Sequence, residues 1–221
     1  MASLIRQLKS IVEERSVLDH PFYQAWQKGE VTKSALQLYA KQYYPHVLAF
    51  PTYVSNVHAN CPDLGVRQQI LENLIEEERG PDNHPELWLR FAEGLSLSRG
   101  QVARSRALPK TQAFIDTFVD ATRNSSYPAG MAALYAYESQ IPEVSRVKIT
   151  GLKQFYGVKD KRSLQFFTAH MGLDEIHSEV AADIIAKRAG SNGGQKEVLR
   201  AAKRVADGYL GFLDGVMEAT S

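Results

Sequence analysis

The amino-acid sequence predicts an all-α protein, folded as a single helical bundle of about eight helices over residues 1–221. Apolar residues recur with helical spacing along nearly the whole chain, and no segment shows the alternating pattern that is typical of a strand. The connections between the periodic segments are short, as they are in helical bundles. A chain of 221 residues is also long enough to bury a sizeable core in one domain.

Each predicted helix carries its own apolar stripe, and some have recognisable ends. The first stripe covers residues 4–12, with Ser3 as a candidate N-cap. A long helix is expected after Thr32 as its cap, and Pro45 and Pro51 should kink it because proline lacks a backbone donor. The other predicted elements are a short helix after Pro21, stripes at residues 66–74 and 87–95, helices at residues 111–123, 128–141, 143–155, 162–171, 174–189 and 195–219, a loop at residues 60–63 and a glycine-rich linker at residues 190–194.

Composition and charge exclude several classes of protein. The 26 Lys and Arg against 25 Asp and Glu give a formal charge of +1, so neither nucleic acid nor an anionic membrane is expected as a partner. The single cysteine, Cys61, cannot form an internal disulfide, a redox pair or a thiolate metal cage. Residues 1–15 mix charged with apolar residues, unlike a signal peptide, and no apolar run approaches the roughly 18 residues of a transmembrane helix. We therefore expect a cytoplasmic protein, with a homodimer as one open arrangement.

Titratable side chains stand on several apolar stripes, where burial is costly unless the group is paired or binds a metal. The strongest pattern is His170, Asp174 and His177, which stand at i, i+4 and i+7 and therefore on one face of a helix. Gly172 lies inside this triplet and should weaken the helix slightly.

Two weaker patterns carry the same residue types. Glu138 lies in phase with the apolar residues of another predicted helix. Glu77 and His84 are seven residues apart, nearly two turns, so they share a face if the helix is continuous between them. Glu76 and Glu78 fit this phase less well and are interpreted as the solvated flank of the acidic run.

Together these residues provide three carboxylates and three imidazoles. Carboxylates and histidines that project inward from facing helices form two-metal sites in helical bundles. Nitrogen and oxygen ligands without thiolate suit iron or manganese, and zinc accepts the same ligand types. The alternative is that each group is a hydrogen-bonded core residue or a cap. The other histidines, His20, His46 and His58, are interpreted as structural.

Lys148 is also unexpected, because this charged residue occupies an apolar position on the stripe of residues 144–155. It either extends to the rim or pairs with a carboxylate, or it is a desolvated amine with a lowered pKa that acts as a nucleophile or nitrogen donor. Tyr39 and Tyr43 lie one turn apart, and Tyr23 precedes them. These tyrosines are either core aromatics or, beside an oxidising metal pair, the side chains that are easiest to oxidise.

The combined pattern resembles the haem-oxygenase-like dimetal oxidases over nearly the whole chain. The residues that carry the resemblance are Glu77-x6-His84, Glu138 within Tyr137-Glu138-Ser139-Gln140, and His170-x3-Asp174-x2-His177. The resemblance implies a haem-oxygenase-like fold and two metal ions, iron with iron or manganese with iron, that activate O2 with electrons from an external reductant. It assigns the six ligands to Glu77, His84, Glu138, His170, Asp174 and His177.

Within this superfamily the chain is most similar to the subgroup that includes the Chlamydia protein associating with death domains. Residues 19–23, 42–44 and 76–78 agree with that subgroup, as do Tyr23, Tyr39 and Lys148. The resemblance implies a self-sacrificing enzyme that converts its own tyrosine side chain to p-aminobenzoate for folate biosynthesis. Tyr23 would be consumed, Tyr39 would be a radical relay or alternative donor, and Lys148 would supply the amine.

Two other functions remain open at this point. A dimetal oxidase that acts on an external fatty acid or amino acid needs the same metal ligands. A metal-stabilised interaction protein without turnover would also keep them, and only oxygen consumption by the reduced, metal-loaded protein separates it from an enzyme.

Overall fold

The computed structural model describes residues 2–220, apart from the side chains of Ala2, Leu173 and Glu175. Within these residues the chain forms helices and no strand, which confirms the all-α class, although there are eleven α-helices where about eight were predicted. The elements are α1 (Ala2–Glu13), the 3-10 helix η1 (Val17–Asp19), α2 (Pro21–Lys28), α3 (Lys33–Asn60), α4 (Leu64–Glu78), α5 (His84–Gly94), α6 (Arg99–Ala103), α7 (Pro109–Arg123), α8 (Tyr127–Glu138), α9 (Ile141–Gln154), α10 (Lys161–Arg188) and α11 (Asn192–Glu218).

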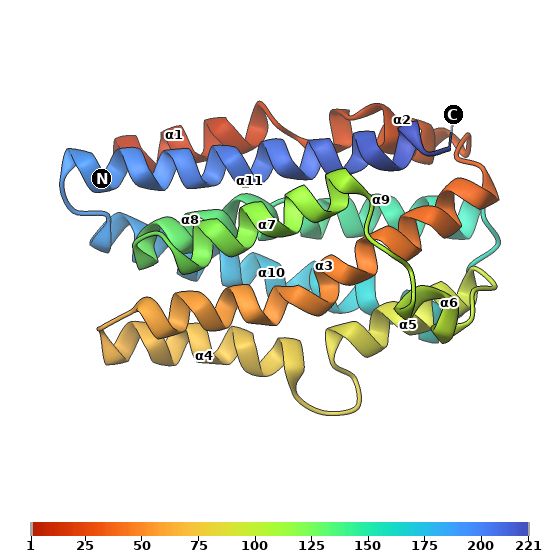
Figure 1. Ribbon diagram of the computed structural model, residues 1–221, viewed down its shortest axis with the longest axis horizontal. Helices are drawn as coiled ribbons and strands as arrows, with labels where there is room; N and C mark the ends of the chain where they lie inside the picture. The colour runs from red at the N-terminus through yellow and green to blue at the C-terminus, as the bar shows by residue number, and fades with distance from the viewer. Residues whose placement is uncertain (1, 221) are drawn as a thin grey trace.

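Helix α8 lies in the middle of the bundle. It packs against α11 on one side and α10 on the other, and α7 also contacts it. Figure 1 shows α1 beside α11 at one face of the molecule, with α3 and α4 at the opposite face. Every residue of α8 from Pro128 to Glu138 is buried. The last residues of α8 therefore lie inside the protein, where a carboxylate needs a partner.

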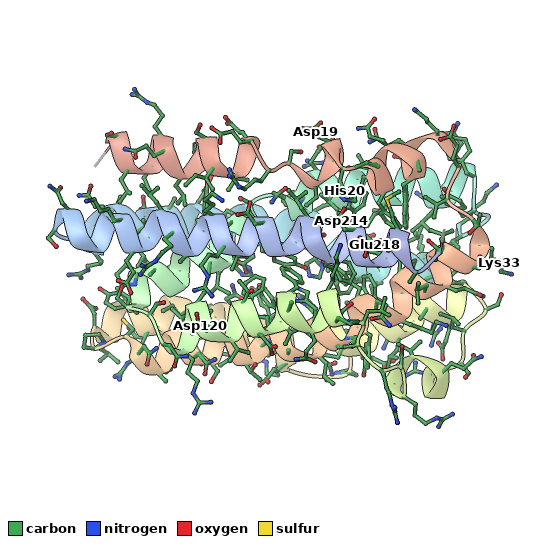
Figure 2. The ribbon with its side chains drawn as sticks, turned by 45° about the horizontal axis from the view of Figure 1, so that its top comes forward. Asp19, His20, Lys33, Asp120, Asp214 and Glu218 are labelled. Atoms are coloured by element: carbon green, nitrogen blue, oxygen red, sulfur yellow. The ribbon has the colours of Figure 1, made fainter. Side chains whose placement is uncertain are left out.

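Several helix ends follow the capping rules. Thr32 caps α3 as predicted, because its Oγ1 accepts a hydrogen bond from the amide of Ala35 at 3.2 Å. His20 caps α2 through Nδ1, and its Nε2 lies 3.1 Å from Asp214 Oδ1 on α11, so it fastens two helices together (Figure 2). The predicted cap Ser3 is wrong, since α1 already contains this residue.

One predicted break does not occur, and another is shorter than predicted. Residues 162–171 and 174–189 were expected as separate helices, but α10 runs without interruption through Gly172. A single glycine costs about 1 kcal/mol in a helix, and packing of α10 against α5, α8 and α9 outweighs this. The linker predicted at residues 190–194 is shorter, because Asn192, Gly193 and Gly194 already belong to α11. A side chain at Gly194 would clash with the carbonyl of Ala189, so the first turn of α11 requires glycine at this position.

Other features agree with the sequence. Pro45 and Pro51 both lie inside α3, and its ribbon bends along its length (Figure 1). Residues 61–63 form the predicted loop before α4. Short α6 was not predicted, although Ser98 and Gln101 form a capping box at its start. None of the described helices is long and apolar enough to cross a membrane.

Candidate metal centre and tyrosine cluster

One group of candidate ligands comprises Glu77, His84 and His170. Each offers a ligand atom within 4.8 Å of the others, and all three side chains are buried. Glu77 lies in the last turn of α4 and His84 is the first residue of α5. The helix is therefore not continuous between them, and the turn at residues 79–83 instead brings Glu77 Oε2 to 2.6 Å from His84 Nδ1. The predicted proximity is correct, but a helix break produces it.

The second group comprises Glu138, Asp174 and His177, again with ligand atoms within 4.8 Å of one another. Glu138 is the last residue of α8, and the other two lie on α10. Two residues that the sequence did not single out as ligands support this group. Asn73 donates a hydrogen bond to Glu138 Oε1 at 2.8 Å, and Glu76 Oε2 lies 2.9 Å from His177 Nε2. Glu76 is thus not only a solvated flank, although 37% of its side chain is exposed.

The two groups share one interior cavity. His170 and Asp174 are one turn apart on α10 and belong to different groups. The cavity lies among ten buried residues, which are His46, Val47, Phe50, Glu77, His84, Tyr137, Glu138, Phe166, His170 and Asp174. The cavity has a volume of about 10 Å³, which is enough for roughly one water molecule.

Burial dominates the electrostatics of these ligands. It raises the pKa of Glu77 to about 8 and also raises the pKa of Glu138 and of Asp174, because the charged carboxylates are removed from water. It lowers the pKa of His170 to about 4. Burial also opposes protonation of His177, but Asp174 and Glu138 outweigh it and raise that pKa to about 9. The protein therefore holds several acidic groups whose ionised forms need nearby positive charge.

Lys148 lies in the interior and not at the rim of the bundle. Its side chain is 2% exposed, and Nζ lies 5.7 Å from the ring centre of Tyr23, 5.2 Å from that of Tyr39 and 5.0 Å from that of Tyr43. The rings of Trp88 and Phe167 are at similar distances. Burial lowers the pKa of the amine to about 7, so a large fraction is neutral near physiological pH.

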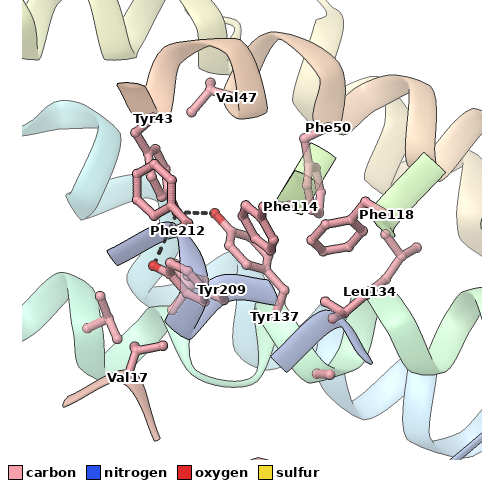
Figure 3. Close-up of a cluster of buried hydrophobic side chains, with 14 of the residues drawn as sticks. Val17, Tyr43, Val47, Phe50, Phe114, Phe118, Leu134, Tyr137, Tyr209 and Phe212 are labelled. Atoms are coloured by element: carbon pink, nitrogen blue, oxygen red, sulfur yellow. Dashed lines mark hydrogen bonds between the residues drawn. The ribbon is translucent and has the colours of Figure 1, made fainter. Parts of the chain in front are cut away.

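A series of neighbouring tyrosine hydroxyls extends from the cavity to the tyrosines whose rings surround this amine. Tyr137, which borders the cavity, hydrogen-bonds to Tyr43, and the Tyr43 hydroxyl lies 3.4 Å from that of Tyr209 (Figure 3). Tyr209 is in turn close enough to Tyr23 to influence its pKa, and the Tyr23 and Tyr39 hydroxyls are 3.2 Å apart. Burial raises the pKa of all five phenols, so they stay protonated at neutral pH. Tyr209 was not predicted as a site residue, because on the apolar stripe of α11 it looks like any core aromatic.

A sequence profile of the iron-containing redox enzymes matches residues 37–209, most of the chain and all six candidate ligands. The chain belongs to this family. Its relatives include the 4-aminobenzoate synthase of Nitrosomonas europaea, which is 44% identical over 96% of this chain and 90% of that protein. The 4-aminobenzoate synthase of Chlamydia muridarum is 38% identical over 98% of this chain and 91% of that protein. These matches confirm the resemblance that the ligand pattern indicated.

The fold agrees with this assignment. The structure of a TenA homologue from Pseudomonas syringae pv. tomato superposes with a TM-score of 0.83, at 21% identity, over 98% of this chain and 92% of that chain. At this identity the likeness shows the fold alone.

The donor set fits what an iron-containing redox enzyme requires. His84 Nδ1 and His177 Nδ1 are buried and face carboxylate oxygens without hydrogen-bond geometry, Glu77 Oε2 at 2.6 Å and Asp174 Oδ1 at 3.7 Å. Asp174 Oδ2 is buried and has no hydrogen-bond partner among the described residues. His170 Nδ1 lies 2.6 Å from the carbonyl oxygen of Phe166, which fixes the proton on Nδ1 and leaves the Nε2 lone pair available. Divalent cations would satisfy these atoms and lower the pKa values of the buried carboxylates. The two groups therefore support a dimetal centre in the interior of the bundle.

Proposed function

We propose that this chain is a 4-aminobenzoate synthase that makes the product from its own Tyr23 side chain, with Lys148 as the source of the amino group. The observation that carries the proposal is the position of the Lys148 amine, which is buried among the rings of Tyr23 and Tyr39. The names of the full-length relatives support the product. The six candidate ligands would hold two metal ions, either two irons or a manganese and an iron. When bound, these ions would supply the activation of dioxygen, with electrons from an external reductant.

The atoms of the product are consistent with a tyrosine source. The ring and Cβ of Tyr23 provide the six ring carbons and the carboxyl carbon, so the Cα–Cβ bond must break. Cβ is oxidised to the level of a carboxylate, for which dioxygen is the oxidant. Nitrogen from Lys148 replaces the phenolic oxygen, which leaves as water. The Cε–Nζ bond of Lys148 therefore breaks as well, and Cε ends as an aldehyde, with dioxygen accepting the two electrons that this oxidation releases. Because the amine has a pKa of about 7, much of it carries the lone pair that bond formation to carbon requires.

The small cavity argues against an external substrate. A fatty acid or an amino acid needs a pocket of roughly 300 Å³ or more. The space beside the candidate ligands is about 10 Å³, and its walls are buried side chains. An organic substrate does not fit in such a space. The nearest oxidisable groups are the tyrosines of the protein itself, beginning with Tyr137 at the cavity wall.

The hydroxyl chain provides a route between the cavity and Tyr23. A phenol with a raised pKa loses an electron readily only if its proton leaves at the same time. Each hydroxyl from Tyr137 through Tyr43 and Tyr209 has a neighbouring hydroxyl that accepts or donates a proton. Tyr39 lies beside Tyr23, at the end of the series of hydroxyls that is farthest from the cavity, and would act as a relay or as the alternative carbon source.

Isotope labelling tests the proposal directly. Protein that contains ring-labelled tyrosine is loaded with iron, or with manganese and iron, and then exposed to reductant and O2. Labelled 4-aminobenzoate should appear without any added substrate, at no more than one molecule per chain, and peptide mapping should locate the loss of mass at Tyr23. Tyr23→Phe should abolish the product. Tyr53→Phe is the matched control, because Tyr53 is another fully buried tyrosine but lies outside the hydroxyl chain. Many turnovers per chain, or a need for an added ring compound, would refute the proposal.

A further inference from the structure

His46 is a buried imidazole without a described polar partner. It lies on α3, its side chain is fully buried, and neither ring nitrogen has a hydrogen-bond partner among the described residues. Six aromatic rings surround it, the nearest being Phe114 at 4.6 Å and Tyr137 at 4.9 Å between ring centres. A structural histidine in a protein core normally has its nitrogens satisfied, so the sequence-based interpretation of His46 as structural does not account for its surroundings.

The cavity of the candidate metal centre is bordered by His46. The other walls that do not belong to candidate ligands are Val47, Phe50, Phe166 and Tyr137. Of these, only Tyr137 is polar, and its hydroxyl is already hydrogen-bonded to Tyr43. His46 belongs to neither group of ligand atoms within 4.8 Å of one another, so it lies beside the centre and is not a further ligand in this arrangement.

We propose that His46 donates a hydrogen bond to the dioxygen that enters the cavity, and so positions it at the dimetal centre. This inference rests on the proposed function, since it requires the two metal ions. A neutral imidazole carries one N–H donor and one acceptor, and burial keeps His46 neutral by lowering its pKa to about 3. The cavity that His46 borders is the one that the candidate ligands of both groups line, so its imidazole lies beside the place where dioxygen would meet the metals. His46 is thus a positioning residue for the gas and takes no part in holding the metals.

Azide serves as the probe, because it is a small anion that binds to oxidised iron centres and accepts hydrogen bonds. The iron-loaded, oxidised protein is titrated with azide, and affinity and the infrared azide stretch are recorded for His46→Leu and His46→Gln. Leucine and glutamine have similar volumes, but only glutamine keeps an N–H donor. We expect His46→Leu to weaken azide binding about tenfold and to shift the stretch, whereas His46→Gln should keep most of the affinity. Iron content should remain that of the unmodified protein in both variants.

Thermal unfolding of the metal-free protein provides a second measurement. Replacing an unsatisfied buried imidazole with leucine should raise the melting temperature. Tyr53→Phe is the matched control, since Tyr53 is also on α3 and its buried hydroxyl also has no described partner, but it does not border the cavity. It should leave azide binding unchanged. Equal azide affinity and an unshifted stretch in His46→Leu would overturn the role of His46 and leave the metal centre intact. Failure of the unmodified protein to bind iron would overturn the proposed function as well, whereas an iron-loaded protein that binds no azide would overturn only the role of His46.

Discussion

Replacing Lys148 with methionine should stabilise the folded protein, and by more at pH 7 than at pH 9. Methionine is nearly as long as lysine and has no charge, so it fits the aromatic surroundings without desolvating an ammonium group. In the folded protein burial lowers the pKa of Lys148 to about 7, whereas the ordinary value of 10.5 applies to the unfolded chain. Between these two values the unfolded chain binds more protons than the folded protein, so raising the pH in this window favours folding of the lysine protein.

The magnitude follows from the two pKa values. Each unit of difference corresponds to about 1.4 kcal/mol, so the unfavourable free energy of burying Lys148 is roughly 4 kcal/mol at pH 7 and roughly 2 kcal/mol at pH 9. The advantage of the Lys148→Met variant should therefore shrink by about 2 kcal/mol over this range. Changes in packing add a constant to both values and do not alter the difference.

Urea unfolding of the metal-free proteins at pH 7, 8 and 9 measures this difference. Metal-free protein is used so that the release of bound metal does not contribute to unfolding. Lys148 helps to lower the pKa of His170, but at about 4 this pKa lies well below the range of the experiment. Lys153→Met is the matched control, since Lys153 lies on the same helix α9 but is exposed, and surface substitutions change stability by less than about 0.5 kcal/mol. An advantage of Lys148→Met that does not change between pH 7 and pH 9 would refute the argument that the buried amine becomes neutral near pH 7.

Three further predictions concern the site. Glu138→Gln and His170→Ala should each reduce the metal content below two ions per chain, and added metal should raise the melting temperature less than in the unmodified protein; full occupancy in both variants would remove the dimetal centre. Lys148→Arg keeps the cation but not a nucleophilic amine, so product measured by chromatography should vanish at unchanged metal content, whereas an active variant would reduce the lysine to an electrostatic role. Tyr209→Phe keeps the ring but removes a hydroxyl between Tyr43 and Tyr23, and the rate of single-turnover product formation should fall on the order of tenfold or more; an unchanged rate would exclude Tyr209 from the relay.

The candidate ligands were predictable because a carboxylate or imidazole in phase with an apolar stripe contradicts the pattern around it. The spacing of His170, Asp174 and His177 places them on one face of a helix whatever the rest of the fold does. The meeting of Glu77 with His84 was predicted for the wrong reason. Periodicity reports which residues share a face within one helix, and it carries no information about a turn that folds two helices toward each other.

The supporting residues were not predictable by the same reasoning. Asn73 lies one turn before Glu77 on α4 and contacts Glu138 from a distant helix, which only the packing of α4 against the bundle determines. Tyr209 and His46 both stand where core aromatic residues are normal, so their positions raised no contradiction. A tyrosine whose hydroxyl contacts other tyrosine hydroxyls and a tyrosine whose hydroxyl is isolated in the core occupy the same kind of position in the sequence pattern. The difference between them is a contact between helices that are far apart in the sequence.

The proposed use of Tyr23 as a substrate would depend on the same burial that holds its ring beside Lys148. Tyr23 is fully buried, packs edge-on against Phe22 and contacts Trp26, so its ring is held beside the amine of Lys148 without any binding step. The proposed reaction removes that ring and leaves a cavity, and losing a large core side chain costs on the order of 3–5 kcal/mol. That loss is a large fraction of the 5–15 kcal/mol by which folded proteins are typically stable. An external substrate leaves its enzyme unchanged after each cycle, whereas a core residue that serves as substrate weakens the fold that positioned it. On this proposal each protein molecule is limited to a single turnover, because the site cannot be rebuilt without a newly synthesised chain.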